Sequence, residues 1–169
     1  MTHPLVIQLR FARSEFARGL DGVTEEEATR RFEPMNCISW MVGHLASQEN
    51  YYWVRAAQEI KLHPEVVEQT GSGRPATTPS LAGMWTAWRD ITVAADTYLD
   101  TLTTGHLSQH IEFKGRALPE SIGTMLYRNI YHYWYHLGEG MAVRQLLGHT
   151  DLPEFIGDMS AVGYRPEAE

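Results

Sequence analysis

Four long segments of this chain repeat apolar residues with the roughly 3.6-residue period of an α-helix, and no segment alternates convincingly enough to form a core β-strand. The segments cover residues 4–19, 37–59, 81–104 and 122–147. Residues that helix ends prefer flank them, namely Pro4, Gly19, Asn36, Ser80, Gly105, Ser121 and Gly148. The pattern predicts an all-α fold of the four-helix-bundle type.

The connections between these segments are of mixed length. Residues 24–27 form a capping-box pattern, which predicts a short helix over 25–31. Residues 61–79 contain three prolines and two glycines and are predicted to form a long loop. Such a loop allows a long crossover connection, and whether it covers a functional site stays open. Residues 106–119 are predicted to be an irregular link with a short extended piece at 110–113.

Composition excludes several classes of protein. A chain of 169 residues with 43% hydrophobic side chains suits one domain over 1–169, with a core at about 4–148 and a tail at 149–169. Its 14 basic and 21 acidic residues give a net charge of −7, which argues against a nucleic-acid partner. No apolar run approaches the roughly 20 residues of a membrane helix, and the N-terminus does not resemble a signal peptide. Because the single Cys37 cannot form an internal disulfide, we expect a cytoplasmic protein without a membrane partner.

Histidine is the residue type that indicates a functional site. His132 and His136 are four residues apart, so their side chains lie on one face of the last helical segment. Imidazoles at this spacing can direct Nε2 atoms at one metal ion, at about 2.1 Å each. His44 lies in the middle of the apolar face of the second segment and offers a third ligand. Three imidazoles leave coordination positions open for water or substrate, which is typical of a catalytic metal site.

The same spacing also permits a purely structural interpretation. Histidines on an apolar face are often hydrogen-bonded core residues, and Tyr131, Tyr133 and Tyr135 could supply their partners. His106 and His110 share the four-residue spacing but follow a glycine in the irregular link, so we expect them on the surface. Spacing alone leaves both interpretations open.

Two motifs extend the analysis beyond spacing, because they resemble signatures of the DinB-like superfamily, which is named for damage-inducible bacterial proteins. The first is the second-helix signature, matched by Asn36, Trp40, His44, Glu49 and Trp53 with the residues between them. The second is the last-helix signature, matched by His132, His136, Gly138, Leu147 and Gly148. The short acidic helix and the Ser-Ile-Gly-Thr sequence at 121–124 are also similar to family features, so the resemblance covers residues 5–150.

The resemblance implies a four-helix bundle that holds a divalent metal ion, nickel or zinc, through His44, His132 and His136. Many family members are classed as metal-dependent hydrolases without a demonstrated substrate. Relatives include transferases that use bacillithiol and a mycothiol-dependent maleylpyruvate isomerase. Family members often pair as dimers through their helices, which implies a homodimer here. One departure is visible, because the residue after the motif glycine is often Gln in the family and is Glu139 in this chain.

Two further residues are candidate catalytic groups. Glu139 lies three residues after His136 and could orient that ligand or act as a general base, or it could be a solvated or interface carboxylate. Arg128 lies one turn before His132 and could bind an anionic substrate group, or it could form an ordinary surface ion pair. Gly138 and Gly140 are predicted to mark a close approach of another helix or of substrate.

These observations lead to two functional hypotheses. The first is a metal-dependent enzyme that activates water or a substrate thiol, as a hydrolase or a thiol-dependent S-transferase acting on a small molecule. A low-molecular-weight thiol is one such substrate. The alternative is a non-catalytic helical bundle, metal-stabilised or metal-free, that acts by dimerisation or by binding a small ligand.

Overall fold

The structure is a computed structural model, and it describes residues 2–154 and 156–164. Its α-helices are α1 (Pro4–Gly19), α2 (Glu25–Thr29), α3 (Ile38–Glu49), α4 (Pro64–Thr70), α5 (Leu81–Leu99) and α6 (Ile122–Leu146). A π-helix, η1 (Asn50–Ala56), follows α3, and a 3-10 turn, η2 (Thr104–His106), follows α5. Two-residue strands β1 (Glu112–Phe113) and β2 (Arg116–Ala117) pair in antiparallel register as a hairpin. The prediction of a helical chain is therefore confirmed, with this small hairpin added.

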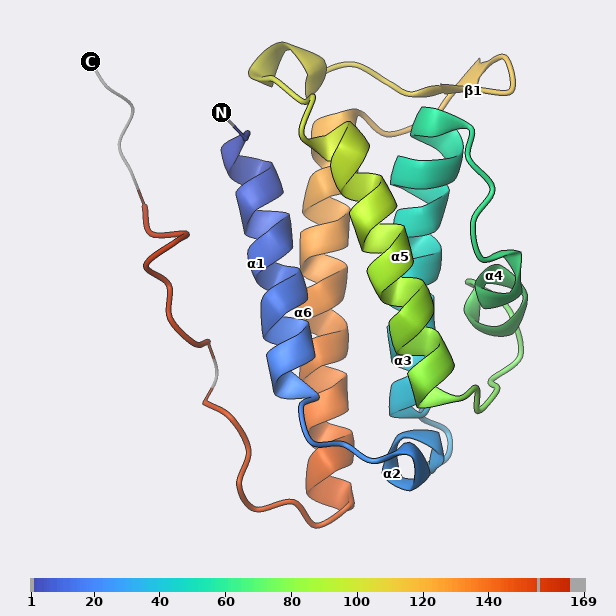
Figure 1. The fold of residues 1–169 in the computed structure, drawn as a ribbon, viewed down its shortest axis with the longest axis vertical. Helices are drawn as coiled ribbons and strands as arrows, with labels where there is room; N and C mark the ends of the chain where they lie inside the picture. Colours follow the sequence, from blue (N-terminus) through green and yellow to red (C-terminus); the bar gives the residue numbers. More distant parts are fainter. Residues whose placement is uncertain (1, 155, 165–169) are drawn as a thin grey trace.

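The four long helices α1, α3, α5 and α6 lie side by side along the long axis of the molecule (Figure 1). Helix α1 packs against α6, and α3 packs against both α5 and α6. Their apolar faces meet in one cluster of buried side chains. Fully buried members with the largest side chains include Leu9, Phe16, Leu45, Trp53, Ile91 and Leu126. Histidines on α3 and α6 can therefore face each other across this packed seam.

Several predicted boundaries are wrong. The segment 37–59 is not one α-helix, because α-helical geometry changes to π geometry at Asn50. Its N-cap is Cys37 rather than Asn36. Residues 81–104 form an α-helix only to Leu99, and the helix predicted over 25–31 ends at Thr29. Of the extended piece predicted at 110–113, strand β1 covers residues 112 and 113. The turn residues Lys114 and Gly115 both have positive φ, as a type I′ hairpin turn requires.

The loop predicted over residues 61–79 contains helix α4, which is the largest correction. Proline breaks the interior of a helix, but Pro64 occupies the first turn of α4, where a missing N–H costs nothing. Val66 and Thr70 are buried, so one side of α4 packs against the body of the protein. In Figure 1, α4 lies beside α3 at the edge of the molecule, and the two helices are in contact.

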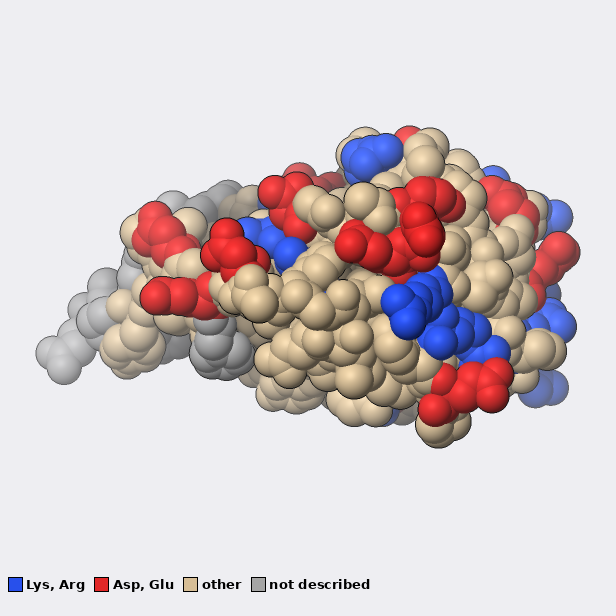
Figure 2. Space-filling model, turned by 90° about the horizontal axis from the view of Figure 1, so that it is seen from below, with Lys and Arg blue, Asp and Glu red and all other residues tan. Residues whose placement is uncertain are grey.

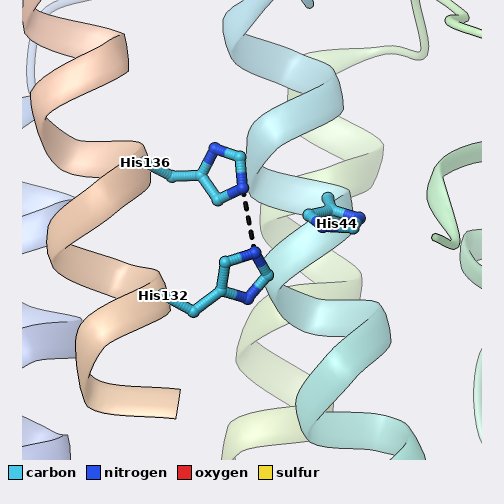
Figure 3. Close-up of side chains that lie close together, drawn as sticks. All are labelled: His44, His132 and His136. Carbon is cyan, nitrogen blue, oxygen red and sulfur yellow. Dashed lines mark hydrogen bonds between the residues drawn. The ribbon is translucent and has the colours of Figure 1, made fainter. Parts of the chain in front are cut away.

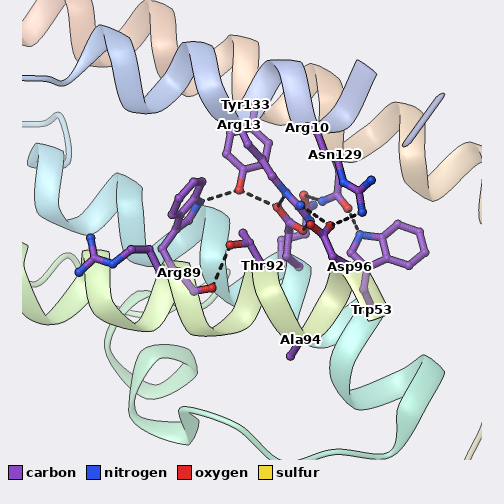
Figure 4. A network of polar contacts seen from close by, with 12 residues as sticks. Arg10, Arg13, Trp53, Arg89, Thr92, Ala94, Asp96, Asn129 and Tyr133 are labelled. Carbon is purple, nitrogen blue, oxygen red and sulfur yellow. Dashed lines mark hydrogen bonds and ion pairs between the residues drawn. The ribbon is translucent and has the colours of Figure 1, made fainter. Parts of the chain in front are cut away.

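A buried polar network joins the four long helices (Figure 4). Glu49 is fully buried and accepts two hydrogen bonds from Arg13, with Nε to Oε1 at 2.8 Å, and one from the Tyr133 hydroxyl at 2.6 Å. Trp88 Nε1 donates to that hydroxyl at 2.7 Å, and Arg13 also pairs with Asp96 at 2.7 Å. Burial opposes the charge of Arg13, yet the Glu49 carboxylate outweighs it and raises the pKa of the guanidinium. The network holds α1, α3, α5 and α6 in register.

The segment after α6 runs along α1 in Figure 1. Gly157 N–H donates to the Glu15 carboxylate at 2.9 Å, and Arg18 donates to the Glu154 carbonyl at 2.8 Å. Seen from the end at which α2 lies, acidic and basic side chains are interspersed (Figure 2). None of the described helices is both long enough and apolar enough to cross a membrane.

Candidate metal centre

Three histidines from two helices converge between α3 and α6 (Figure 3). His44 comes from α3, and His132 and His136 come from successive turns of α6. Their potential ligand atoms all lie within 4.8 Å of one another. The Nε2 atoms of His132 and His136 are 3.0 Å apart. In the described part of the chain, no other His, Cys, Asp or Glu joins this group.

The Nδ1 atom of each ring faces away from this meeting point and has a partner of its own. His44 Nδ1 lies 2.8 Å from the Thr70 carbonyl oxygen, and His136 Nδ1 lies 2.8 Å from a Glu139 carboxylate oxygen. A carbonyl or carboxylate oxygen can only accept a hydrogen bond. Both Nδ1 atoms therefore carry a proton, so in the neutral rings both Nε2 atoms hold a free lone pair.

A chain of hydrogen bonds gives the same result for His132. Trp53 Nε1 can only donate, and it lies 2.6 Å from Asn129 Oδ1. The amide nitrogen of Asn129 must then donate to Gln48 Oε1, at 2.5 Å. The same Gln48 oxygen lies 2.8 Å from His132 Nδ1, which therefore also donates to it. His132 Nε2 is left with a lone pair directed toward the other two rings.

Three lone pairs thus point into one small space. Two of them, on His132 and His136, are 3.0 Å apart and repel each other unless a cation or a proton lies between them. Two nitrogens bound to one tetrahedral ion at about 2.1 Å would be about 3.4 Å apart, which is close to this separation. Burial, with the neighbouring His136 and His44, lowers the pKa of His132 to about 3. Burial also lowers the pKa of His44, although the Thr70 hydrogen bond opposes it. The residues fit a divalent cation.

The surroundings of His44 hold its ring in place. Trp40 stacks on it with ring centroids 4.4 Å apart and planes 16° apart. Gly43 lets both α5 and α4 approach α3, because a Cβ atom at that position would lie 2.5 Å from Met84 Sδ and 2.8 Å from the Thr70 side chain. The sequence does not predict the Thr70 carbonyl as a partner of His44, because its pattern indicates a loop where α4 lies. Gly140 does mark a close approach, since a Cβ there would lie 3.0 Å from Leu20. Gly138 does not, because its Cβ would meet none of the described atoms within 4 Å.

His44 and His132 help to line a groove of about 1240 Å³, and His136 is not among its lining residues. Arg128 also lines this groove and is exposed, and its Nε donates to Glu120 at 2.7 Å. Glu139 lies beside His136 rather than in the groove lining. His106 and His110 do not belong to the cluster, and their Nδ1 atoms lie near the Thr103 N–H and the Leu118 carbonyl oxygen instead.

Comparisons with known proteins agree with this fold. A sequence model described as the DinB superfamily matches residues 8–139, a span that contains all three histidines. The structure is similar to the crystal structure of a DinB-like protein from Bacillus cereus ATCC 10987, with a TM-score of 0.64 and 17% sequence identity over 90% of this chain and 95% of that one. The comparison with curated proteins gives no match. Because the family match covers most of its length, this chain belongs to the DinB superfamily.

Proposed function

We propose that this protein is a metal-dependent enzyme in which His44, His132 and His136 hold one divalent cation, nickel or zinc. The observation that carries the proposal is the hydrogen bonding of the three Nδ1 atoms, which leaves three Nε2 lone pairs facing one another. Metal-binding histidines usually donate their other ring N–H to a carboxylate, carbonyl or amide partner in this way. The arrangement of α1, α3, α5 and α6 fits a four-helix bundle, whose metal sites draw ligands from facing helices.

Access to the groove supports catalysis rather than a structural role. Structural zinc sites normally have four protein ligands, whereas the described residues supply three. His44 and His132 both line the groove, so a substrate can reach the open side of the cluster. When bound, a cation of this kind acidifies a coordinated water or thiol, which is the chemistry of hydrolysis and of thiol transfer.

The chain's own residues orient the ligands and the substrate. Gln48, Thr70 and Glu139 each hold one Nδ1–H and so direct one Nε2 toward the centre. We place Glu139 as a positioning residue that fixes the orientation of the His136 ring through its Nδ1–H. Arg128 presents its guanidinium on the groove wall, with Glu120 holding it there. We further propose a small-molecule substrate, such as a low-molecular-weight thiol, and a cytoplasmic homodimer.

Metal analysis of the purified protein is the first test. Protein prepared without chelator, or reconstituted with nickel or zinc, should hold one ion per chain. Replacing any one of His44, His132 and His136 by Ala should remove most of the metal affinity, whereas the exposed His110→Ala control should not change it. A wild-type protein that takes up neither ion would refute the metal site.

Turnover is the second test, because metal binding alone does not make an enzyme. Metal-loaded protein should convert a member of an ester, amide or thiol-conjugation panel, and chelation should abolish that activity. If the protein binds metal but converts no substrate, the non-catalytic alternative is favoured. Sedimentation at micromolar concentration tests the homodimer, which a mass near that of one 19.2 kDa chain would exclude.

A further inference from the structure

Tyrosine is the dominant aromatic residue of the groove next to the histidines. Five tyrosines line it, two from η1 and three from α6, namely Tyr51, Tyr52, Tyr127, Tyr131 and Tyr135. The three on α6 follow one another at four-residue intervals, so they share one edge of the helix. Their exposed fractions are 47%, 64% and 70%, and the first two rings are nearly parallel with centroids 6.0 Å apart. Exposed aromatic rings gathered in one groove are typical of a binding surface.

The groove also carries an excess of positive charge. Arg55, Arg74 and Arg128 line it, and Glu120 is the one acidic residue among its described lining. Glu120 is already engaged by Arg128 through two hydrogen bonds. Arg55 and Arg74 have no carboxylate partner among the described residues, although Arg55 lies 5.8 Å from the centre of the Phe113 ring. In a chain with a net charge of −7, the described lining of this groove carries three positive charges and one negative charge.

We propose that the groove binds an organic anion with a flat aromatic body. Its oxyanion group would meet the guanidinium groups of Arg55 and Arg74, and its body would lie against the tyrosine rings. The far end of the molecule would then reach His44 and His132. A guanidinium fork fits a carboxylate or a phosphate equally well, so the shared chemistry is an oxyanion. This inference deepens the proposed function, because it names the substrate class of the same site.

Two features favour a small anion over larger partners. Only two arginines in the described groove lack a carboxylate, which is too few for the phosphate contacts of a nucleic-acid site. A volume of about 1240 Å³ comfortably encloses a drug-sized molecule. The tyrosine edge of α6 could instead pack against a second copy of the chain, and the experiment below separates that outcome.

Matched ligands test the charge and the aromatic body separately. Binding of 2-naphthoate and 2-naphthyl phosphate is measured by calorimetry against the neutral 2-naphthamide, and against acetate and inorganic phosphate, which lack the ring. We expect at least one naphthyl anion to bind about tenfold or more tightly than the amide, and the ringless anions to bind more weakly. The tighter of the two naphthyl anions identifies the oxyanion. Equal affinity for naphthamide and both anions would overturn the proposal.

Variants locate the site. Arg55→Gln or Arg74→Gln should weaken naphthyl-anion binding by about tenfold, since each removes a charge-assisted contact. Arg89→Gln, an exposed arginine of α5 outside the groove, is the matched control and should bind as wild type does. Tyr131→Ala should weaken binding of the naphthyl anions and of the amide alike. Unchanged affinity in both groove-arginine variants refutes the assignment. A Tyr131→Ala protein that binds the naphthyl anions normally but sediments at a smaller mass than wild type also refutes it, because the tyrosine edge is then an interface between copies of the chain.

The design separates this inference from the metal site. The same ligands are measured on metal-loaded, metal-free and His132→Ala protein, with metal content determined for each. If metal is bound and no anion is preferred, only the present inference fails. If no metal is bound but the arginine-dependent preference persists, the metal site fails and the anion groove stands.

Discussion

Replacing Gln48 by Leu is the sharpest test of the hydrogen-bond chain that orients His132. Gln48 Oε1 accepts from both His132 Nδ1 and Asn129 Nδ2. Leucine removes that acceptor and leaves two donors without a partner. Outer-shell substitutions of this kind usually cost about 10- to 100-fold in metal affinity, or roughly 1.4 to 2.7 kcal/mol. Because Asn129 is fully buried, its unsatisfied amide should also lower the free energy of unfolding by about 1–3 kcal/mol.

The assay is a competition titration of metal against a chromophoric chelator, combined with urea unfolding of the metal-free protein. Gln58→Leu is a matched control, because its amide donates to the Trp53 and Ala94 carbonyls and does not contact the histidines. That control should lose stability but keep its metal affinity. Gln48→Glu supplies an acceptor again and should restore binding. A Gln48→Leu protein with metal affinity within twofold of wild type would show that this chain of hydrogen bonds does not set the His132 tautomer.

Three further predictions follow from the buried groups. Arg13→Met leaves the fully buried Glu49 carboxylate without its counter-ion, so it should lower the free energy of unfolding by about 3–5 kcal/mol. Urea unfolding measures this loss, which a value below about 1 kcal/mol would contradict, and the metal affinity should be unchanged. Because the folded-state pKa of His132 is about 3, below its ordinary value of about 6.5, the unfolded chain binds more protons between these values. Metal-free protein should therefore be most stable above about pH 6.5 and lose stability as the pH falls toward 3, less steeply in His132→Ala. Gly43→Ala should displace the Met84 side chain and Thr70 of α4, and so lower both the melting temperature and the metal affinity. Gly138→Ala, at an open helical position, should stabilise by up to about 1 kcal/mol, and equal effects at the two glycines would refute the close approach at Gly43.

Local sequence signals predicted the elements that they directly govern. Helix α1 begins at Pro4 and ends at Gly19 as predicted, and Ser121 caps α6. Capping residues and proline act on the helix turn next to them, so these ends can be predicted from the local sequence. The spacing of His132 and His136 likewise predicts two rings on one face, since helix geometry alone brings them together. His44 is predicted to be the third ligand from its place on an apolar helix face and from the family resemblance.

Features that depend on contacts between helices escaped prediction. Arg13 and Glu49 lie within otherwise apolar helix faces, and only their mutual contact makes burial of either charge tolerable. The partner of His44 is a backbone carbonyl, at Thr70, and a carbonyl has no residue-type signature. Gln48 did carry a signal, since it lies four residues after His44 on the same face, but its role appears only with α6 in place.

The π-helix η1 has a consequence for how this chain can change length. In an α-helix each residue advances the side-chain direction by about 100°, and the i→i+5 bonding of a π turn takes up an additional residue without continuing that rotation. Returning residues 50–56 to α geometry without removing a residue would rotate the chain after them by about 100° relative to His44, whereas removing one residue would restore α geometry and keep the later directions. Trp53, which donates to Asn129, and Arg55, which lines the groove, both lie within this stretch, so the directions of their side chains depend on its π geometry. This stretch is therefore an angular spacer that takes up one residue, and a single deletion inside it should disturb the packing of the helix less than a deletion within 38–49.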